Sequence, residues 1–309
     1  MSLSPTANVD TQRWISASPE LDHLPLTELI WPGAHNAGMD KKAPNYQVIV
    51  GHWTTCQNGS FAWQLEKGAR AFDLRLGYTA DAPAGIFYFH HNGYRSHRVL
   101  DELIDAVSAF LDRNPDEFIV LDFHQLSDGE RFFDFRQFNE LIVRRLGPRA
   151  IHPSHGDRTL GQLKANSALK RVVLSAGAST ELDKTYFWLR IPHRWSGNRL
   201  TNVQDLRRHI TTTLETPRYG SFLWSLTATS YSFLGGPMDI KQHINEWFHS
   251  SRDWVTQCSI ISTDFFDESE IVGYCWVANN MKAVQHNPSG VVRALPTRLA
   301  DLDTGILGR

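Results

Sequence analysis

The sequence lacks a disulfide framework, a long apolar run and a strong excess of charge of either sign. Cysteine occurs at only three positions among 309 residues, and neither this odd number nor the spacing suits a paired framework or a metal site. No apolar run approaches the roughly 20 residues that span a bilayer. The formal net charge is −2, which argues against binding through phosphate neutralisation, so we expect no nucleic-acid partner. The three cysteines are Cys56, Cys258 and Cys275.

The N-terminus also lacks the features of a secretion signal. The residues MSLSPTANVD contain neither a basic head nor an apolar core, so no signal peptide is expected. We therefore expect a soluble protein that is cytoplasmic or exported by another route. Such a protein would meet a membrane only from outside.

The residues that are abundant favour one folded domain. Hydrophobic residues make up 41% of the chain and charged residues 21%, which is typical of a well-packed globular core. No internal repeat or low-complexity linker interrupts the chain, so we expect one catalytic domain over residues 14–285. The following residues, 286–309, are rich in Pro, Gly and Arg, and we expect a loosely attached tail there.

Short apolar runs alternate with longer amphipathic stretches, which is the βα pattern of a parallel sheet. Eight strand-like runs favour a single, distorted (β/α)8 barrel of the α/β class. A doubly wound open sheet is the alternative, although no glycine-rich phosphate loop follows the first strand. The expected strands are 28–31, 69–76, 86–91, 118–124, 171–175, 186–190, 221–226 and 260–265, and the expected helices are 99–113, 130–146, 203–214, 239–253 and 269–281.

Polar side chains gather where the expected strands end. The active-site groups of a barrel come from the C-terminal ends of its strands. Charged groups inside a barrel are costly unless they pair, so a repeated pattern is hard to explain by packing. Side chains alternate along a strand, so His91 is expected to face the site and His90 to point away. The polar strand ends are His35, Asp73, Arg75, His91, Asp122, His124, Ser262 and Asp264.

Each of these residues has a simpler explanation when it is taken alone. A histidine at a strand end is often structural, Asp73 and Arg75 can form a structural ion pair, and Asp122 can belong to a polar network. The joint pattern favours a site, because barrel closure puts the last strand beside the first and brings Asp264 near His35. A histidine oriented by a carboxylate is the usual form of a general base.

Six short segments form an ordered set of motifs. They are WPGAHN at 31–36, GARAFDLR at 68–75, FHHNG at 89–93, NPDEFIVLD at 114–122, VQD at 203–205 and STD at 262–264. Their order and spacing resemble the catalytic X domain of phosphatidylinositol-specific phospholipase C, especially its bacterial single-domain members. The resemblance extends from Leu24 to Gln285. It implies a distorted (β/α)8 barrel that cleaves phosphatidylinositol to diacylglycerol and inositol 1,2-cyclic phosphate.

The resemblance implies a role for each polar strand end. His35 would be the general base, oriented by Asp264, and His91 would be the general acid that protonates the departing diacylglycerol oxygen. Arg75 would hold the non-bridging phosphate oxygens, which suits its planar fork of donors. Asn36 stands where bacterial relatives carry an aspartate that supports the general acid.

The resemblance also bears on the headgroup and on metals. The expected headgroup contacts are Asp73, His124, Asp205 and Arg207, with Arg207 in the place of a tyrosine that stacks on the inositol ring. Calcium-dependent relatives have acidic ligands where Arg75 and His124 stand, and a guanidinium cannot ligate Ca²⁺. We therefore expect no metal and no cofactor.

Two loops at the C-terminal mouth are expected to touch the bilayer, because they combine apolar side chains with Trp or Tyr. The expected partner is phosphatidylinositol in membranes, bound by a peripheral monomer that is secreted by analogy with the family. The alternative explanation is that these side chains pack on each other. The proposed contacts are Val48, Ile49, Trp53, Tyr231, Phe233 and Leu234.

Two other functions remain as alternatives. One is a metal-dependent glycerophosphodiesterase or sphingomyelinase D-like enzyme, which needs a cluster of carboxylates that Arg75 disfavours. The other is a catalytically silent phosphoinositide-binding module. Loss of a catalytic histidine or of Arg75 would indicate that module, and both histidines and the arginine are present.

Overall fold

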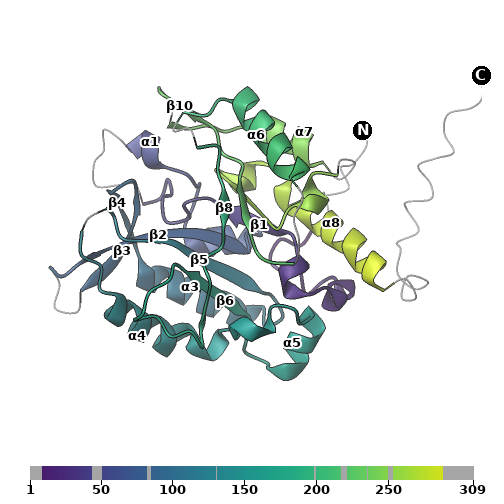
Figure 1. The fold of residues 1–309 in the computed structure, drawn as a ribbon, viewed down its shortest axis with the longest axis horizontal. Coiled ribbons are helices and arrows are strands. Elements are labelled where there is room, and N and C mark those ends of the chain that lie inside the picture. The colour runs from purple at the N-terminus through teal and green to yellow at the C-terminus, as the bar shows by residue number, and fades with distance from the viewer. Residues whose placement is uncertain are drawn as a thin grey trace, which may run out of the picture.

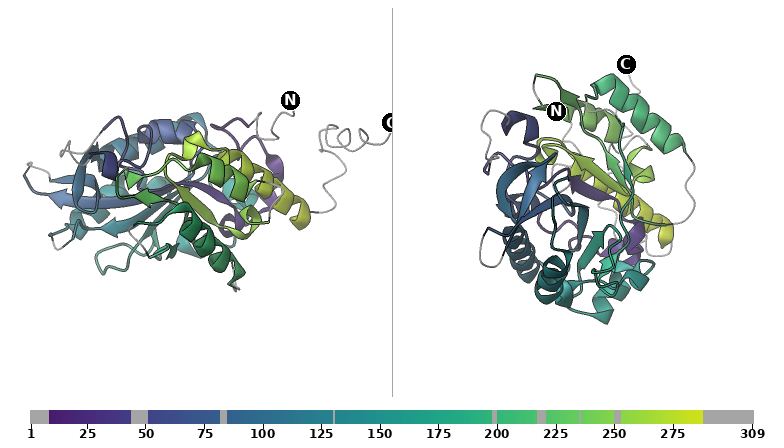
Figure 2. Two further views of the ribbon diagram at one scale, coloured as in Figure 1. Left: turned by 90° about the horizontal axis from the view of Figure 1, so that it is seen from above. Right: turned by 60° about the vertical axis from the view of Figure 1, so that its left-hand side comes forward.

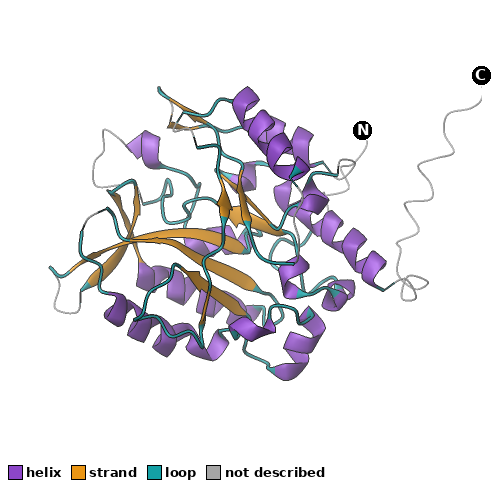
Figure 3. Cartoon of the chain, in the orientation of Figure 1, coloured by secondary structure: helices purple, strands orange, loops and turns teal. Residues whose placement is uncertain are grey.

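A computed structural model describes residues 9–43, 51–81, 85–129, 131–197, 200–216, 221–234, 236–249 and 253–287. Its centre is a curled sheet of parallel strands with helices on the outside (Figure 1, Figure 3). The parallel strands are β1 (Trp31–Ala34), β2 (Ala71–Thr79), β5 (Ile119–Leu126), β6 (Val172–Ala176), β7 (Phe187–Trp188), β8 (His193–Arg194), β9 (Ser225–Thr227) and β12 (Ile260–Thr263). The helices are α1 (Gly51–Thr54), α2 (Phe61–Glu66), α3 (Leu100–Arg113), α4 (Phe135–Leu146), α5 (Leu160–Asn166), α6 (Val203–Glu215), α7 (Lys241–Phe248) and α8 (Ile271–His286).

The sheet has the topology of a barrel. Its parallel strands lie in the order β7-β6-β5-β2-β1-β12-β9-β8, and the parallel pairing of β12 with β1 joins the last strand to the first. A doubly wound open sheet would not make that pairing. The described residues show no pairing between β7 and β8, so the ring stays open there. The predicted distorted (β/α)8 barrel is confirmed, and this gap is one source of its distortion.

Two of the expected strands are placed differently in the structure, and one barrel strand was not expected. The first runs from Trp31 to Ala34, later than expected, because residues 26–28 form a 3-10 turn. The strand β3 (Ile86–His91) is not a barrel strand but pairs antiparallel with β2 and with β4 (Tyr94–Val99). The link from β2 to β3 is too short for the crossover that a parallel neighbour requires. The sixth barrel strand, β8, was missed because it has only two residues.

Helices cover the outside of the sheet through apolar stripes. The helix α3 buries Leu103, Ile104, Val107 and Phe110, which recur at the spacing of one helix face. In Figure 1, α3, α4 and α5 lie below the sheet, and α6, α7 and α8 lie at the upper right. The two turned views in Figure 2 also show the helices on the outside of the strands. None of the described helices combines the length and apolar character needed to cross a membrane.

The antiparallel ribbons complete the described strands. The strands β2, β3 and β4 extend toward the left of Figure 1, where β3 carries His91 back to the mouth of the barrel. A second ribbon pairs β10 (Tyr231–Ser232) with β11 (Gly236–Pro237). A Cβ atom at Gly236 would lie 2.5 Å from the His52 carbonyl oxygen, so a glycine is required where this ribbon meets α1.

A buried ion pair fastens the N-terminal segment to the bottom of the barrel. The Arg70 guanidinium lies 2.9 Å from Glu117 and donates to the carbonyl oxygens of Thr11 and Gln12. The Glu117 carboxylate accepts the backbone N–H of Ile15. Both side chains of the pair are fully buried, so each charge depends on the other for compensation.

We expect Arg70→Ala to destabilise the fold by about 3–5 kcal/mol, because it leaves the Glu117 charge buried and unpaired. Arg113→Ala removes a half-exposed partner of Glu66 and should cost less than about 1 kcal/mol. Urea unfolding of both variants measures the difference. Equal losses in the free energy of unfolding would show that the buried Arg70–Glu117 pair stabilises the fold no more than the exposed Arg113–Glu66 pair.

Candidate functional site

Strand pairing brings together the two ends that carry His35 and Asp264. The strands β1 and β12 are parallel with Ala34 opposite Thr263, so the next residue of each strand emerges side by side. The chain then turns sharply at both places, because Asn36 and Phe265 adopt left-handed backbone angles with φ of 42° and 46°. For a bulky residue such as Phe265 this conformation is strained, and strain of this kind is frequent at functional sites.

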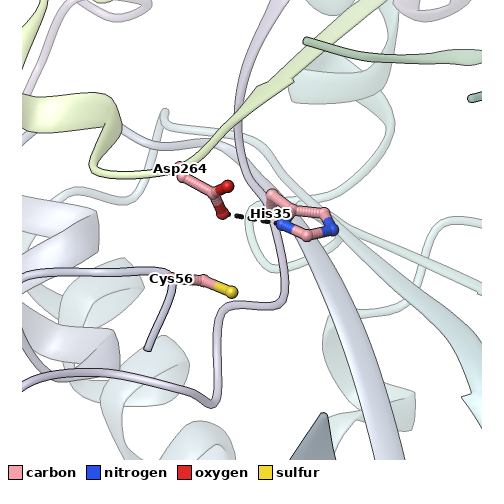
Figure 4. A group of neighbouring side chains, drawn as sticks. All are labelled: His35, Cys56 and Asp264. Atoms are coloured by element: carbon pink, nitrogen blue, oxygen red, sulfur yellow. Dashed lines mark hydrogen bonds and ion pairs between the residues drawn. The ribbon is translucent and has the colours of Figure 1, made fainter. Parts of the chain in front are cut away.

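The contacts of His35 fix the position of its proton. The Nδ1 atom lies 2.7 Å from Asp264 Oδ1, as Figure 4 shows, and the Nε2 atom lies 2.8 Å from the Arg75 Nη2 atom. Arginine can only donate, so Nε2 must be the acceptor and Nδ1 must carry the hydrogen that Asp264 accepts. His35 is 4% exposed. Its Nε2 lone pair accepts the hydrogen bond from the guanidinium.

Arg75 is held by an ion pair of its own. Its Nε and Nη2 atoms donate to the two carboxylate oxygens of Asp73, at 3.3 and 2.8 Å. Burial opposes the charge on both groups, but their mutual attraction prevails, so the pKa of Arg75 is raised. The same attraction, with contributions from His124 and His35, holds the pKa of Asp73 well below its usual range. Both groups are therefore charged at neutral pH.

His91 faces this pair from strand β3. Its ring lies edge-on to that of His35, with 6.4 Å between the centroids. The Nδ1 atom is 3.2 Å from the carbonyl oxygen of Thr54 and donates to it, which leaves Nε2 for chemistry. Burial, together with the nearby charge of Arg75, lowers the pKa of His91 to about 3. His91 is therefore neutral at pH 7.

The predicted support of His91 by Asn36 is absent from the described contacts. Asn36 is fully buried, and neither its Oδ1 nor its Nδ2 atom has a hydrogen-bond partner among the described residues. The ring of His91 is held by Thr54 instead. Its neighbour His90 is buried and accepts the backbone N–H of Gly93, and the division of roles between the two histidines stays a prediction.

A segment that sequence reasoning missed braces the site. The Gln57 side chain donates to the carbonyl oxygens of His35 and Thr263 at 2.8 and 3.0 Å, and so ties the two strand ends together. The preceding residue, Cys56, lies beside the His35–Asp264 pair (Figure 4). Its Sγ atom is 3.7 Å from the Tyr231 hydroxyl. No sequence signal marks this segment, because it lies in the irregular connection after β1 and not at a strand end.

A second polar cluster lies beside Asp73, since Asp122 of β5 is opposite Asp73 of β2. Asp122 accepts a 2.6 Å hydrogen bond from Nε2 of His193, the first residue of β8, and the His193 ring stacks on His124 with 3.7 Å between centroids. Burial raises the pKa of Asp122 and lowers that of His124 to about 3. The sequence singled out Asp122 and His124 but not His193, which stands on a strand too short to show a pattern.

Other predicted contacts lie outside these clusters or outside the described residues. Asp205, in the first turn of α6, bonds to Asn202 and Arg208 of the same segment. Arg207 is exposed on the same helix. Their roles in headgroup binding stay predictions. Val48 and Ile49 fall in residues 44–50, which are not described.

The remaining proposed membrane contacts form an apolar rim on α1 and the β10–β11 ribbon. Trp53, Phe233 and Leu234 are 41%, 67% and 84% exposed. The rings of Trp53 and Phe233 lie 5.8 Å apart, so they pack on each other and still face solvent. Tyr231 has a different position, since its hydroxyl points inward to Cys56 and its ring contacts His35 and His91.

Two variants should raise the pKa of His91. Arg75→Met removes a positive charge that disfavours the imidazolium, and Asn36→Asp adds a negative charge that favours it. A histidine NMR titration should place the wild-type pKa well below the ordinary value of about 6.5 and both variants above the wild type. Arg131→Met, which removes a surface charge, is the control and should cause no shift. A wild-type pKa near 6.5 would contradict the buried, cation-facing environment of His91.

Comparisons with known proteins agree with the motifs and the fold. No family model matches the chain. The sequence is 26% identical over 294 residues to the mouse PI-PLC X domain-containing protein 2, which covers 82% of this chain and 83% of that protein. It is 28% identical over 291 residues to the variant-surface-glycoprotein phospholipase C of Trypanosoma cruzi, which covers 74% of each. Both relatives are eukaryotic, whereas the motifs alone pointed to bacterial enzymes.

The fold is similar to that of solved bacterial phospholipase structures. The solved phosphatidylinositol-specific phospholipase C of Listeria monocytogenes superimposes with a TM-score of 0.64 at 18% identity. The match covers 88% of this chain and 99% of that one. The chain thus resembles PI-PLC X domain proteins in sequence and shares the distorted barrel of the bacterial phosphatidylinositol-specific phospholipases C.

Proposed function

We propose that this chain is a phosphatidylinositol-specific phospholipase C that produces diacylglycerol and inositol 1,2-cyclic phosphate. The observation that carries the proposal is the arrangement of three side chains. The Nε2 atom of His35 accepts a hydrogen bond from Arg75, and the His91 ring lies edge-on to the His35 ring across the site. A base, a cation and an acid in this order suit transfer of a phosphodiester to a neighbouring hydroxyl. The relatives named above support the substrate class.

The base is available only after an exchange of partners. In the structure Arg75 donates to His35 Nε2. When the inositol 2-hydroxyl takes this place, it gives its proton to Nε2 and attacks phosphorus, while Arg75 turns its donor to a non-bridging phosphate oxygen. Asp264 stabilises the imidazolium that forms, because it already accepts the Nδ1 hydrogen.

The acid depends on the substrate for its proton. With a pKa of about 3, His91 is neutral at pH 7. The negative phosphate of a bound lipid favours the imidazolium and so raises this pKa toward the working range. The protonated Nε2 then delivers its proton to the departing diacylglycerol oxygen. His91 therefore acts as an acid only when a phosphodiester is bound.

Arg75 also supports catalysis without calcium. Ca²⁺ prefers several oxygen ligands, but Arg75 occupies both carboxylate oxygens of Asp73. The nearby Asn36 Oδ1 atom is free of hydrogen bonds among the described residues, and a single amide oxygen is a weak ligand by itself. The residues therefore do not fit a calcium ion, and the guanidinium supplies the positive charge.

We expect full cleavage of phosphatidylinositol in a chelator and no gain from added Ca²⁺. His35→Ala and His91→Ala should each lower the rate by a factor on the order of 10² to 10⁴, the usual contribution of a positioned base or acid. Arg75→Ala should lower it by a factor on the order of 10² to 10³ through lost charge stabilisation. Initial rates on mixed micelles measure all three.

His90→Ala is the matched control, since it removes the adjacent imidazole that points away from the site. It should retain most of the activity. A strict requirement for Ca²⁺, or a loss in His90→Ala as large as that in His91→Ala, would be incompatible with these assignments.

We also propose that the rim of Trp53, Phe233 and Leu234 docks on the bilayer surface. These exposed side chains lie beside the mouth, because the ribbon that carries two of them also places Tyr231 against both catalytic histidines. Apolar and aromatic side chains on such a rim are suited to the interface between headgroups and acyl chains.

The double variant Trp53→Ala/Phe233→Ala should bind phosphatidylinositol vesicles on the order of 10²-fold more weakly, because each large side chain contributes through its buried apolar area. Its activity on a soluble, short-chain substrate should change little. Leu169→Ala, an exposed position just before β6 at the opposite end of the barrel, is the control. Equal losses on vesicles and on the soluble substrate would assign the rim to packing.

A further inference from the structure

We propose that His35, Cys56 and Asp264 form an inhibitory site for a borderline or soft divalent cation such as Zn²⁺ or Cd²⁺. The cation would occupy the position behind the general base, on the side of the ring that faces away from the substrate. Binding of the cation depends only on these three side chains and not on the proposed function. The inhibition, in contrast, rests on the function proposed above.

The geometry brings three different donor atoms to one place. One ligand atom from each of His35, Cys56 and Asp264 lies within 4.8 Å of the others. Figure 4 shows the sulfur atom of Cys56 directed toward the hydrogen-bonded pair. The second carboxylate oxygen of Asp264, Oδ2, is buried and has no hydrogen-bond partner among the described residues. A carboxylate oxygen left without a partner at such a place is a ready ligand.

Further donors border the same space. The Cys56 Sγ atom lies 3.8 Å from Nδ1 of His91 and 3.7 Å from the Tyr231 hydroxyl. A cation bound to the sulfur would therefore lie near the Nδ1 atoms of both His35 and His91, on the sides of the rings that face away from the substrate. A small inward movement of the side chains would complete the first shell of ligands.

The donor set selects the cation. Imidazole nitrogen, carboxylate oxygen and thiolate sulfur are the ligands of Zn²⁺, and thiolate also favours Cd²⁺ over the hard ions Ca²⁺ and Mg²⁺. The other candidate cluster, formed by Asp122, His124 and His193, is less suitable. Its imidazoles are stacked 3.7 Å apart at 15°, so their in-plane lone pairs run parallel and do not converge.

Binding rearranges two protons. Burial, and next the nearby Asp264 charge, raise the pKa of the Cys56 thiol well above its ordinary value, which makes the free thiol a poor nucleophile. On binding, the thiol proton leaves to solvent and the sulfur bonds to the cation. The His35 proton moves by way of solvent from Nδ1 to Nε2, because the cation takes the Nδ1 lone pair. Arg75 then withdraws its donor from Nε2, and Asp73 Oδ2, 3.6 Å from Nε2, is placed to accept the new hydrogen. The lone pair that would accept the substrate proton is then lost.

The binding test needs no enzyme activity. Titration of the folded wild-type chain with Cd²⁺ should produce the ultraviolet absorption of a cadmium–thiolate bond, with one ion per chain. Cys56→Ser should abolish this absorption, and Cys258→Ser, which removes another buried thiol, should retain it. Circular dichroism checks that both variants fold. A cadmium signal that survives in Cys56→Ser, or that disappears only in His193→Ala, would overturn the proposal.

The inhibition test uses each variant's own basal rate as its reference. The Zn²⁺ concentration that inhibits the wild type should be at least 10²-fold lower than the concentration that inhibits Cys56→Ser. A chelator should restore the rate. One proton leaves per ion, so the inhibitory concentration should fall about tenfold for each rise of one pH unit. Equal inhibition of the wild type and Cys56→Ser would overturn it. Cadmium binding in a chain without phospholipase activity would instead refute only the proposed function.

Discussion

The contact between Arg75 and His35 is the constraint on which the rest of the site depends. Because a guanidinium only donates, its approach to Nε2 assigns the lone pair of His35 to that atom and the hydrogen to Nδ1. The same guanidinium is fixed by Asp73, and its charge adds to burial, the larger cause, in lowering the pKa of His91. In the proposed mechanism one side chain thus prepares the base, helps to hold the acid neutral until a phosphate arrives and supplies the cation.

Barrel closure is what makes this contact possible. The pairing of β1 with β12 places His35 beside Asp264, and Gln57 ties both strand ends from outside the sheet. The β2 strand contributes Asp73 and Arg75 from the adjacent position. The gap between β7 and β8 lies away from this seam, so the barrel can be open on one side without loosening the catalytic pair.

The parts of the site that follow strand periodicity could be predicted from the sequence. His35, Asp73 and Arg75 stand on or just after strands with clear apolar patterns, and closure of the sheet implied the approach of Asp264. Cys56 and Gln57 could not be predicted, because they lie in an irregular connection whose path depends on tertiary contacts. His193 was missed for a related reason, since a two-residue strand has no period. The strand β3 was read as part of the barrel because an apolar run does not reveal its strand direction.

The central claim is that His35 accepts the proton of the inositol 2-hydroxyl, so that the first product is a cyclic phosphate. The most direct measurement is ³¹P NMR of product formation from phosphatidylinositol and from its 2-deoxy analogue, both in a chelator. The account predicts inositol 1,2-cyclic phosphate as the first product from phosphatidylinositol and no cleavage of the analogue. An acyclic phosphomonoester as the first product, or cleavage of the analogue at a comparable rate, would contradict it.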